Sequence, residues 1–187
     1  MRTLLTTTIC CLITAFSTAA YLRTQEEDMM AKMMELATPG TEHTEFQKAA
    51  GEWKMEMEFD WTGSGTFEKT TANTVCKPIL GGRYMYEDVS FEMMGMPVTG
   101  VSIMGYDKLK GEYISLWMDT MSTWWISSRG KKNADGLIEL KGMMPEMQGD
   151  IPFRQTIRVD PDGSSTMRMY HTIAGKEVEV MRTRTSR

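Results

Sequence analysis

The chain has 187 residues, with 21 Lys and Arg against 25 Asp and Glu, and its formal net charge at pH 7 is −4. This mildly acidic balance argues against nucleic acid as a partner, because nucleic-acid-binding surfaces are rich in basic side chains. The length favours one sizeable domain, and no segment beyond the first twenty residues is long and apolar enough to span a bilayer.

Residues 1–20 have the pattern of a secretory signal peptide. Arg2 gives a basic start, an apolar run reaches Ile13, and the small residues from Ser17 to Ala20 suit a cleavage site. We therefore expect an exported protein, periplasmic or secreted, with no membrane span after cleavage; an uncleaved anchor is the alternative. Losing the leader would leave 20 basic and 25 acidic residues, a net charge of −5, and Cys76 as the sole cysteine. No intrachain disulfide could then form.

Two short segments precede the main domain. Residues 21–28 are polar and indicate a tether, and methionines at helical spacing then predict a short amphipathic helix that stops before Pro39-Gly40. A second short helix is expected from Thr41 to Ala50, with Thr41 as its N-cap and Phe46 facing inward. We assign residues 21–38 to the tether and first helix, and residues 39–187 to the main domain.

The stretch Gly51–Gly63 has the clearest pattern in the chain. Its odd positions are apolar: Trp53, Met55, Met57, Phe59 and Trp61. Its even positions are charged: Glu52, Lys54, Glu56, Glu58 and Asp60. Alternation with a period of two predicts a β-strand with one buried face and one wet face.

Strand-like runs separated by turn signals continue to the C-terminus. We expect strands near 65–77, 82–92, 97–107, 112–119, 123–131, 137–144, 151–160, 164–172 and 175–185. About ten strands joined by tight turns favour an all-β fold, a single antiparallel up-and-down barrel of the lipocalin-like or calycin-like kind. Trp53 is interpreted as a barrel plug, with Arg182 or Arg184 of the last strand stacked on its indole ring.

Several short motifs together resemble the bacterial domain of unknown function 1579 family. They are Pro39-Gly40-Thr41-Glu42-His43, Gly51-Glu52-Trp53, Leu80-Gly81-Gly82-Arg83, Met93-Met94-Gly95-Met96-Pro97, Gly105-Tyr106-Asp107 and Trp117-Met118-Asp119-Thr120-Met121. The resemblance covers roughly residues 29–182 and implies a lipocalin-like or calycin-like barrel that is often exported. It brings no established activity and no catalytic residues. The methionine-rich segment Met143–Asp150 departs from the family pattern.

Strand parity selects candidates for the lining of the barrel interior. They are Met55, Met57, Phe59, Met85, Glu87, Trp117, Met167 and Met169. Our leading hypothesis is a barrel that binds a small apolar molecule in its interior. A structural or partner-binding envelope protein with a filled barrel is the alternative. Motifs of hydrolase nucleophiles, phosphate loops and dinucleotide sites are absent, so nothing in the sequence indicates an enzyme.

A further alternative is a metal or haem protein. The chain has 20 methionines, and clustered thioethers suit Cu(I). Met167, Met169 and His171 share strand parity, so they are the candidate copper ligands, and His171 is the candidate haem ligand. The structural interpretation is that methionines fill the core or line a pocket, and that His171 is hydrogen-bonded or on the surface. No cofactor is predicted.

Two acidic residues, Glu87 and Asp119, occupy positions of inward parity. A buried acid needs a partner, and we expect Glu87 to pair with Arg83; a polar anchor for a ligand headgroup is the other interpretation. We interpret Cys76 as a small buried residue rather than a reactive thiol.

Overall fold

The computed structural model describes residues 23–187, and the predicted signal peptide lies outside this range. Residues 23–37 form a helix, so the expected tether is helical from residue 23 onward. Ion pairs one turn apart, Arg23 with Glu27 and Lys32 with Glu35, support the helix on its polar face. Within the described residues, no helix is long and apolar enough to cross a membrane.

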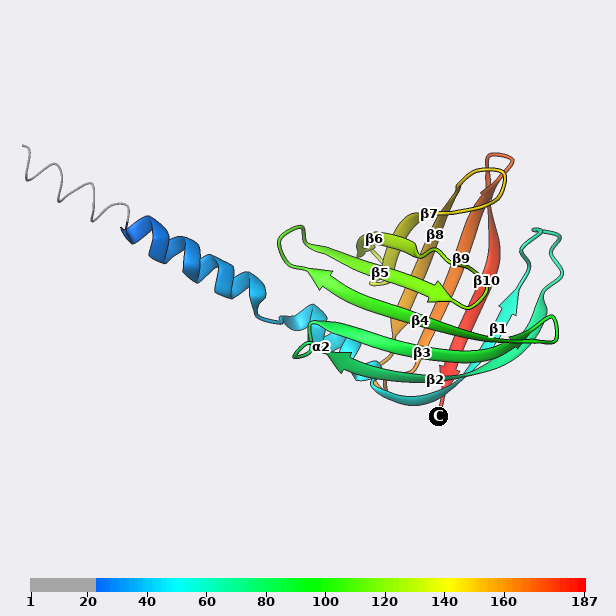
Figure 1. Ribbon diagram of the computed structural model, residues 1–187, viewed down its shortest axis with the longest axis horizontal. Helices are drawn as coiled ribbons and strands as arrows, with labels where there is room; N and C mark the ends of the chain where they lie inside the picture. Colours follow the sequence, from blue (N-terminus) through cyan, green and yellow to red (C-terminus); the bar gives the residue numbers. More distant parts are fainter. Residues whose placement is uncertain (1–22) are drawn as a thin grey trace, which may run out of the picture. The chain divides into compact units, whose positions relative to one another are not determined.

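Residues 39–187 form a second compact unit, in which ten antiparallel strands close into a barrel (Figure 1). The strands are β1 (Gly51–Phe59), β2 (Glu68–Ile79), β3 (Tyr84–Met93), β4 (Met96–Asp107), β5 (Glu112–Asp119), β6 (Ile126–Lys132), β7 (Ile138–Met144), β8 (Ile151–Val159), β9 (Ser165–Ile173) and β10 (Lys176–Ser186). Each strand pairs with the next along the chain, and β10 pairs with β1. The predicted closed, up-and-down barrel is therefore confirmed.

Strand β1 has the predicted alternation. Trp53, Met55, Met57 and Phe59 are buried, whereas Lys54 and Glu56 on the other face are exposed. The strand ends at Phe59, two residues before the predicted alternation does. Asp60 and Trp61 consequently leave the pattern: Asp60 is buried and Trp61 is exposed, the reverse of our expectation.

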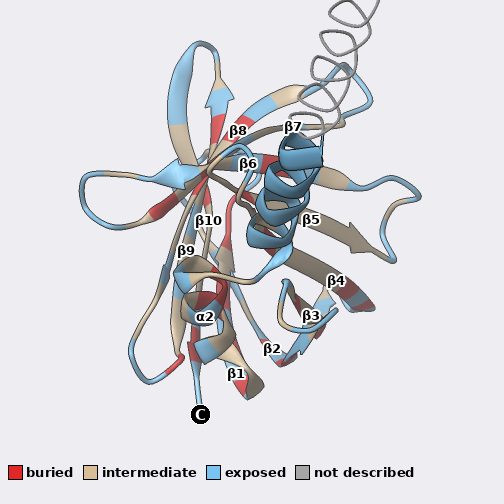
Figure 2. Cartoon of the chain, turned by 90° about the vertical axis from the view of Figure 1, so that its left-hand side faces the viewer, coloured by how far each residue is buried: buried red, intermediate tan, exposed pale blue. Residues whose placement is uncertain are grey.

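One end of the barrel is covered by the short helix α2 (Thr41–Phe46) and a following 3-10 turn, η1 (Gln47–Ala49). Helix α2 has buried and exposed residues, and Phe46 is buried against the barrel core as predicted (Figure 2). Trp53 Nε1 donates a hydrogen bond to the Ala49 carbonyl at 2.8 Å, which ties the turn to β1. The N-cap is Gly40 rather than Thr41.

The cation stacked on Trp53 differs from our prediction. The Arg187 guanidinium lies 4.5 Å from the Trp53 ring centroid, whereas Arg182 lies over Phe67 and pairs with Glu58. The cause is a register shift between Glu179 and Met181 in the pairing of β10 with β9. A β-bulge of this kind reverses the alternation of the residues that follow it, so Arg182 faces outward.

We predict that Trp53→Ala lowers the free energy of unfolding by ~3–5 kcal/mol, as expected for truncation of a buried aromatic side chain. The indole is 5 % exposed, and the substitution also removes the hydrogen bond to Ala49. Urea denaturation of the wild type and the variant measures the loss. Glu56→Ala on the wet face of the same strand is the control and should change stability by less than about 0.5 kcal/mol. Equal losses in the two variants would contradict this assignment of faces.

Candidate ligand cavity inside the barrel

The barrel encloses a cavity of about 710 Å³. All eight residues selected from the sequence line it: Met55, Met57, Phe59, Met85, Glu87, Trp117, Met167 and Met169. They lie on four different strands, β1, β3, β5 and β9, and closure of the sheet turns one face of each strand toward a common interior. The volume falls within the range of roughly 300–1,000 Å³ that is usual for small-molecule sites.

Methionine dominates the apolar lining. Ten lining residues are methionines: Met55, Met57, Met85, Met93, Met104, Met121, Met144, Met167, Met169 and Met181. Unbranched thioether side chains have several rotatable bonds and adapt to guests of different shape. The abundance of methionine in the sequence therefore corresponds in large part to a soft, apolar cavity wall.

The cavity opens at the end of the barrel opposite α2. Because β1 starts beside η1 and neighbouring strands alternate in direction, loops 60–67, 94–95, 120–125, 145–150 and 174–175 all lie at this end. Three residues of these loops, Trp61, Met121 and Glu146, line the cavity and are also exposed. Exposed apolar side chains continue around the opening at Met94, Trp124 and Met147. The mouth of the cavity thus has an apolar rim.

A belt of polar side chains crosses the cavity wall. Glu87 on β3 lies directly opposite Ser102 on β4, and Ser115 on β5 lies directly opposite Ser128 on β6. Gln155 Nε2 donates a hydrogen bond to Ser128 Oγ at 3.2 Å. The three serines and Gln155 were missed in the sequence, although each occupies an inward position of its strand. Polar residues in an otherwise apolar alternation are the signal that could have found them.

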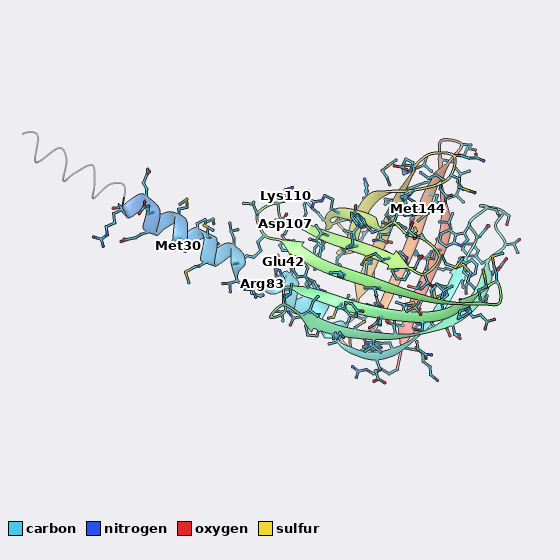
Figure 3. All side chains as sticks on the ribbon, in the orientation of Figure 1. Met30, Glu42, Arg83, Asp107, Lys110 and Met144 are labelled. Atoms are coloured by element: carbon cyan, nitrogen blue, oxygen red, sulfur yellow. The ribbon has the colours of Figure 1, made fainter. Side chains whose placement is uncertain are left out.

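Glu87 is the acidic member of this belt and is not paired with Arg83, contrary to our expectation. Thr74 Oγ1 donates a hydrogen bond to Glu87 Oε1 at 2.8 Å. Burial raises the pKa of Glu87, and the hydrogen bonds from Thr74 and Cys76 only partly offset this effect. Arg83 is exposed in the turn before β3, at the α2 end of the barrel, and donates to the Leu80 carbonyl (Figure 3). The turn geometry at 80–82, where φ is positive, directs Arg83 away from the interior.

Cys76 lies directly across from Glu87 on β2. Burial, reinforced by the neighbouring Glu87 carboxyl, raises the pKa of the Cys76 thiol to about 12. A thiol with such a pKa is a poor nucleophile, because the thiolate is the reactive form. This environment fits a structural role for Cys76.

His171 is buried at the mouth end of β9, with 3 % of the residue exposed. Of the two structural roles that we expected, hydrogen-bonded or on the surface, the second is therefore wrong. Its Nε2 atom has no hydrogen-bond partner among the described residues, and its ring lies 5.8 Å from that of Trp61. Burial lowers the pKa of His171 against the opposing influence of Glu146. Met167 and Met169 line the cavity on the same strand. Residues 23–187 contain no group of three or more His, Cys, Asp or Glu side chains placed to hold a metal ion.

Trp117 lies flat against β4 because Gly100 leaves room for it. A Cβ atom at Gly100 would approach Trp117 Cη2 to 2.3 Å, well inside contact distance. Trp117 Nε1 donates a hydrogen bond to Asp119 Oδ2 at 2.7 Å. Asp119, the second inward acid in the sequence, therefore orients one of the two tryptophans of the cavity wall.

Comparison with known families accounts for the shared motifs. The family model for DUF1579, proteins of unknown function, matches residues 38–187, which include α2, all ten strands and the complete cavity lining. The chain belongs to the DUF1579 family. No curated protein matches it.

Asp60 organises the first mouth loop of this DUF1579 barrel. It accepts hydrogen bonds from Thr62 Oγ1 at 2.8 Å and from the Gly65 N–H at 2.6 Å, and Ser64 Oγ also donates to it. Burial opposes ionisation of the carboxyl, but these hydrogen bonds outweigh it and lower the pKa of Asp60 to about 2. The ionised side chain thereby holds the loop that carries Trp61 at the mouth.

We predict that Asp60→Asn destabilises the DUF1579 barrel near neutral pH and that this difference disappears in acid. The folded-state pKa of about 2 lies below the ordinary value of 3.8, so the stabilisation is complete above the ordinary value. It is lost as the pH falls from about 4 through about 2. Urea midpoints of the wild type and the variant across this range provide the measurement.

Asp150→Asn is the matched control, because Asp150 is an exposed aspartate on another loop at the same end. It removes the same charge without removing the hydrogen bonds of Asp60. A constant difference between wild type and Asp60→Asn from neutral pH down to pH ~2 would show that ionised Asp60 does not stabilise the fold.

Proposed function

We propose that this protein binds a small, largely apolar molecule inside its barrel. The cavity of about 710 Å³ is the observation that carries the proposal. Well-packed interiors have few voids larger than one water molecule, whose share of liquid volume is about 30 Å³. A space more than ten times larger is too big for a packing defect, and its position behind an open mouth suits a guest. A barrel that serves only as a filled structural body does not need such a space.

The chemistry of the wall indicates the kind of guest. Methionine, aromatic and aliphatic side chains together form most of it, and the polar belt from Glu87 to Gln155 is narrow. Apolar surface of the guest would be removed from water on entry, at roughly 25 cal/mol per Å². The few polar groups would fix the orientation of the guest. The exposed apolar rim would favour first contact of an apolar molecule with the mouth.

We predict that an environment-sensitive hydrophobic dye binds the folded protein and that Met57→Trp weakens this binding at least about tenfold, or about 1.4 kcal/mol. Met57 is buried and lines the cavity, so a larger apolar side chain there fills space that the dye needs. Glu56→Trp is the control, because it adds the same bulk to the outer face of β1. Fluorescence titration gives both affinities, and circular dichroism verifies that the variants are folded. Equal affinities for the two variants would mean that the dye binds outside the cavity.

Cu(I) is the second candidate guest, and the unpartnered Nε2 atom of His171, on the same strand as the cavity-lining Met167 and Met169, favours it. An imidazole and two thioethers suit this soft ion. Titration with Cu(I) under reducing conditions separates the candidates in the same preparation. Dye binding without copper uptake supports the apolar guest. Stoichiometric uptake that is lost when Met167, Met169 and His171 are all replaced by alanine supports the metal.

A further inference from the structure

The charge of the cavity wall is one-sided. Its acidic residues are Glu87, Asp119 and Glu146, and its one histidine is His171. No Lys or Arg is among the described residues that line it. Because burial lowers the pKa of His171, its imidazole favours the neutral form and offers little positive charge. The wall therefore contains no strong counter-ion for an anionic guest.

Glu87 is the deepest of the acids. It lies three residues from the start of β3 at the closed end, whereas Asp119 ends β5 at the mouth and Glu146 lies in a mouth loop. Directly below Glu87, on the same face of β3, Met85 belongs to the apolar cluster that contains Phe46 and Trp53. A guest that reached Glu87 would thus have one end near the floor of the cavity.

The wall above Glu87 suits an apolar tail. Met55, Met57 and Val89 form a second apolar cluster, with Phe91 and Trp117 packed against it. From Glu87 to Met93, β3 rises about 20 Å toward the mouth at ~3.3 Å per residue, and each inward side chain on this path is apolar. The arrangement fits an elongated guest with a polar head at the floor and a tail that points toward the mouth.

The groups around the head define its chemistry. Thr74 already occupies Glu87 Oε1, and the Ser102 hydroxyl group comes from the residue directly opposite Glu87, with Cβ atoms roughly 4.5–5.5 Å apart in such pairs. A head that donates hydrogen bonds to a carboxylate and a hydroxyl oxygen would satisfy both. A head that carries its own carboxylate would meet an acidic side chain, and the described lining contains no Lys or Arg to pair with it.

We propose that the cavity selects a lipophilic cation: an apolar molecule with a protonated amine whose ammonium group pairs with the Glu87 carboxylate. This inference rests on the proposed function, since it names the class of the guest. A buried carboxylate without a counter-ion is strongly disfavoured, and the ammonium group supplies the missing charge and donates hydrogen bonds. The hydrogen bond from Thr74 to Glu87 Oε1 holds the Glu87 side chain in place.

The test compares three competitors with the same saturated chain and different heads: dodecylamine, dodecanol and dodecanoate. Each compound is titrated against the bound hydrophobic dye at pH 7, below its micelle-forming concentration, and displacement of the dye gives its affinity. For the wild type we expect dodecylamine to bind at least about tenfold more tightly than dodecanol, because hydrogen bonds between charged groups are stronger than those of a neutral hydroxyl. Dodecanoate should bind more weakly than dodecanol.

Glu87→Gln keeps the size of the side chain and removes the negative charge, so it should bring the affinity for dodecylamine to within about threefold of that for dodecanol. Glu92→Gln is the control, because it removes the same charge from an exposed position of the same strand. It should retain the full preference for the amine. This comparison separates Glu87 from a general attraction of cations to an acidic protein.

The outcomes distinguish this inference from the proposed function. Tight binding of dodecanoate, or an amine preference that survives in Glu87→Gln, overturns the selectivity while the apolar cavity stands. Failure of all three compounds, dodecanol included, to displace the dye or to bind on their own overturns the proposed function itself. The order of the three compounds on the wild type needs no variant, so dodecanoate binding as tightly as dodecylamine overturns the selectivity even if Glu87→Gln does not fold.

Discussion

The pairing of β1 with β10 is the constraint on which the rest of this structure depends. Backbone partners run from Lys54 with Ser186 to Phe59 with Met181, and they join the first strand of the sheet to the last. Closure removes the two exposed edges that an open sheet of this size would present to other chains. It also sends one face of every strand into a common interior. The identity of the inward residues then decides whether that interior is a core or a cavity.

In this chain the inward residues form a packed core at one end of the barrel and a cavity at the other. Near α2, large side chains such as Phe46, Trp53 and Tyr113 meet and fill the barrel. Farther along the strands, glycine and serine occupy inward positions at Gly100, Ser102 and Ser128, and the surrounding methionines do not fill the space between them. The packed end supplies the stability that an end with a large cavity cannot. The barrel thus has a packed floor that supports the fold and an upper part that contains the cavity.

Much of this arrangement was predictable from alternation alone. The order of the strands, the wet and buried faces of β1 and the positions of eight cavity-lining residues all follow from a period of two and short turns. The prediction for Arg182 was wrong because a bulge beside Val180 reverses the parity, and a bulge leaves no mark in a hydrophobic pattern. The reversal at Asp60 has a different cause, since the hydrogen bonds of the turn end the strand there.

The environment of Glu87 was only partly predictable. Its inward parity was visible, but its partner depends on which residue of β2 lies beside it and on the turn that carries Arg83 outward. The alternation of apolar residues reveals neither the pairing register of two strands nor the direction in which a turn points the next side chain. The predicted start of the first helix was too late in the chain. The i,i+4 ion pair between Arg23 and Glu27 adds stability to the first turns that the spacing of apolar residues does not reveal.

The central claim is that the interior of this barrel is a binding site. Native mass spectrometry of the protein gently purified from its own cells is the most direct measurement of it. The account predicts a discrete noncovalent mass on the wild-type chain that is absent from the Met57→Trp variant prepared in the same way. Identical masses for the two proteins, each equal to the bare polypeptide even after incubation with apolar compounds, would contradict the claim.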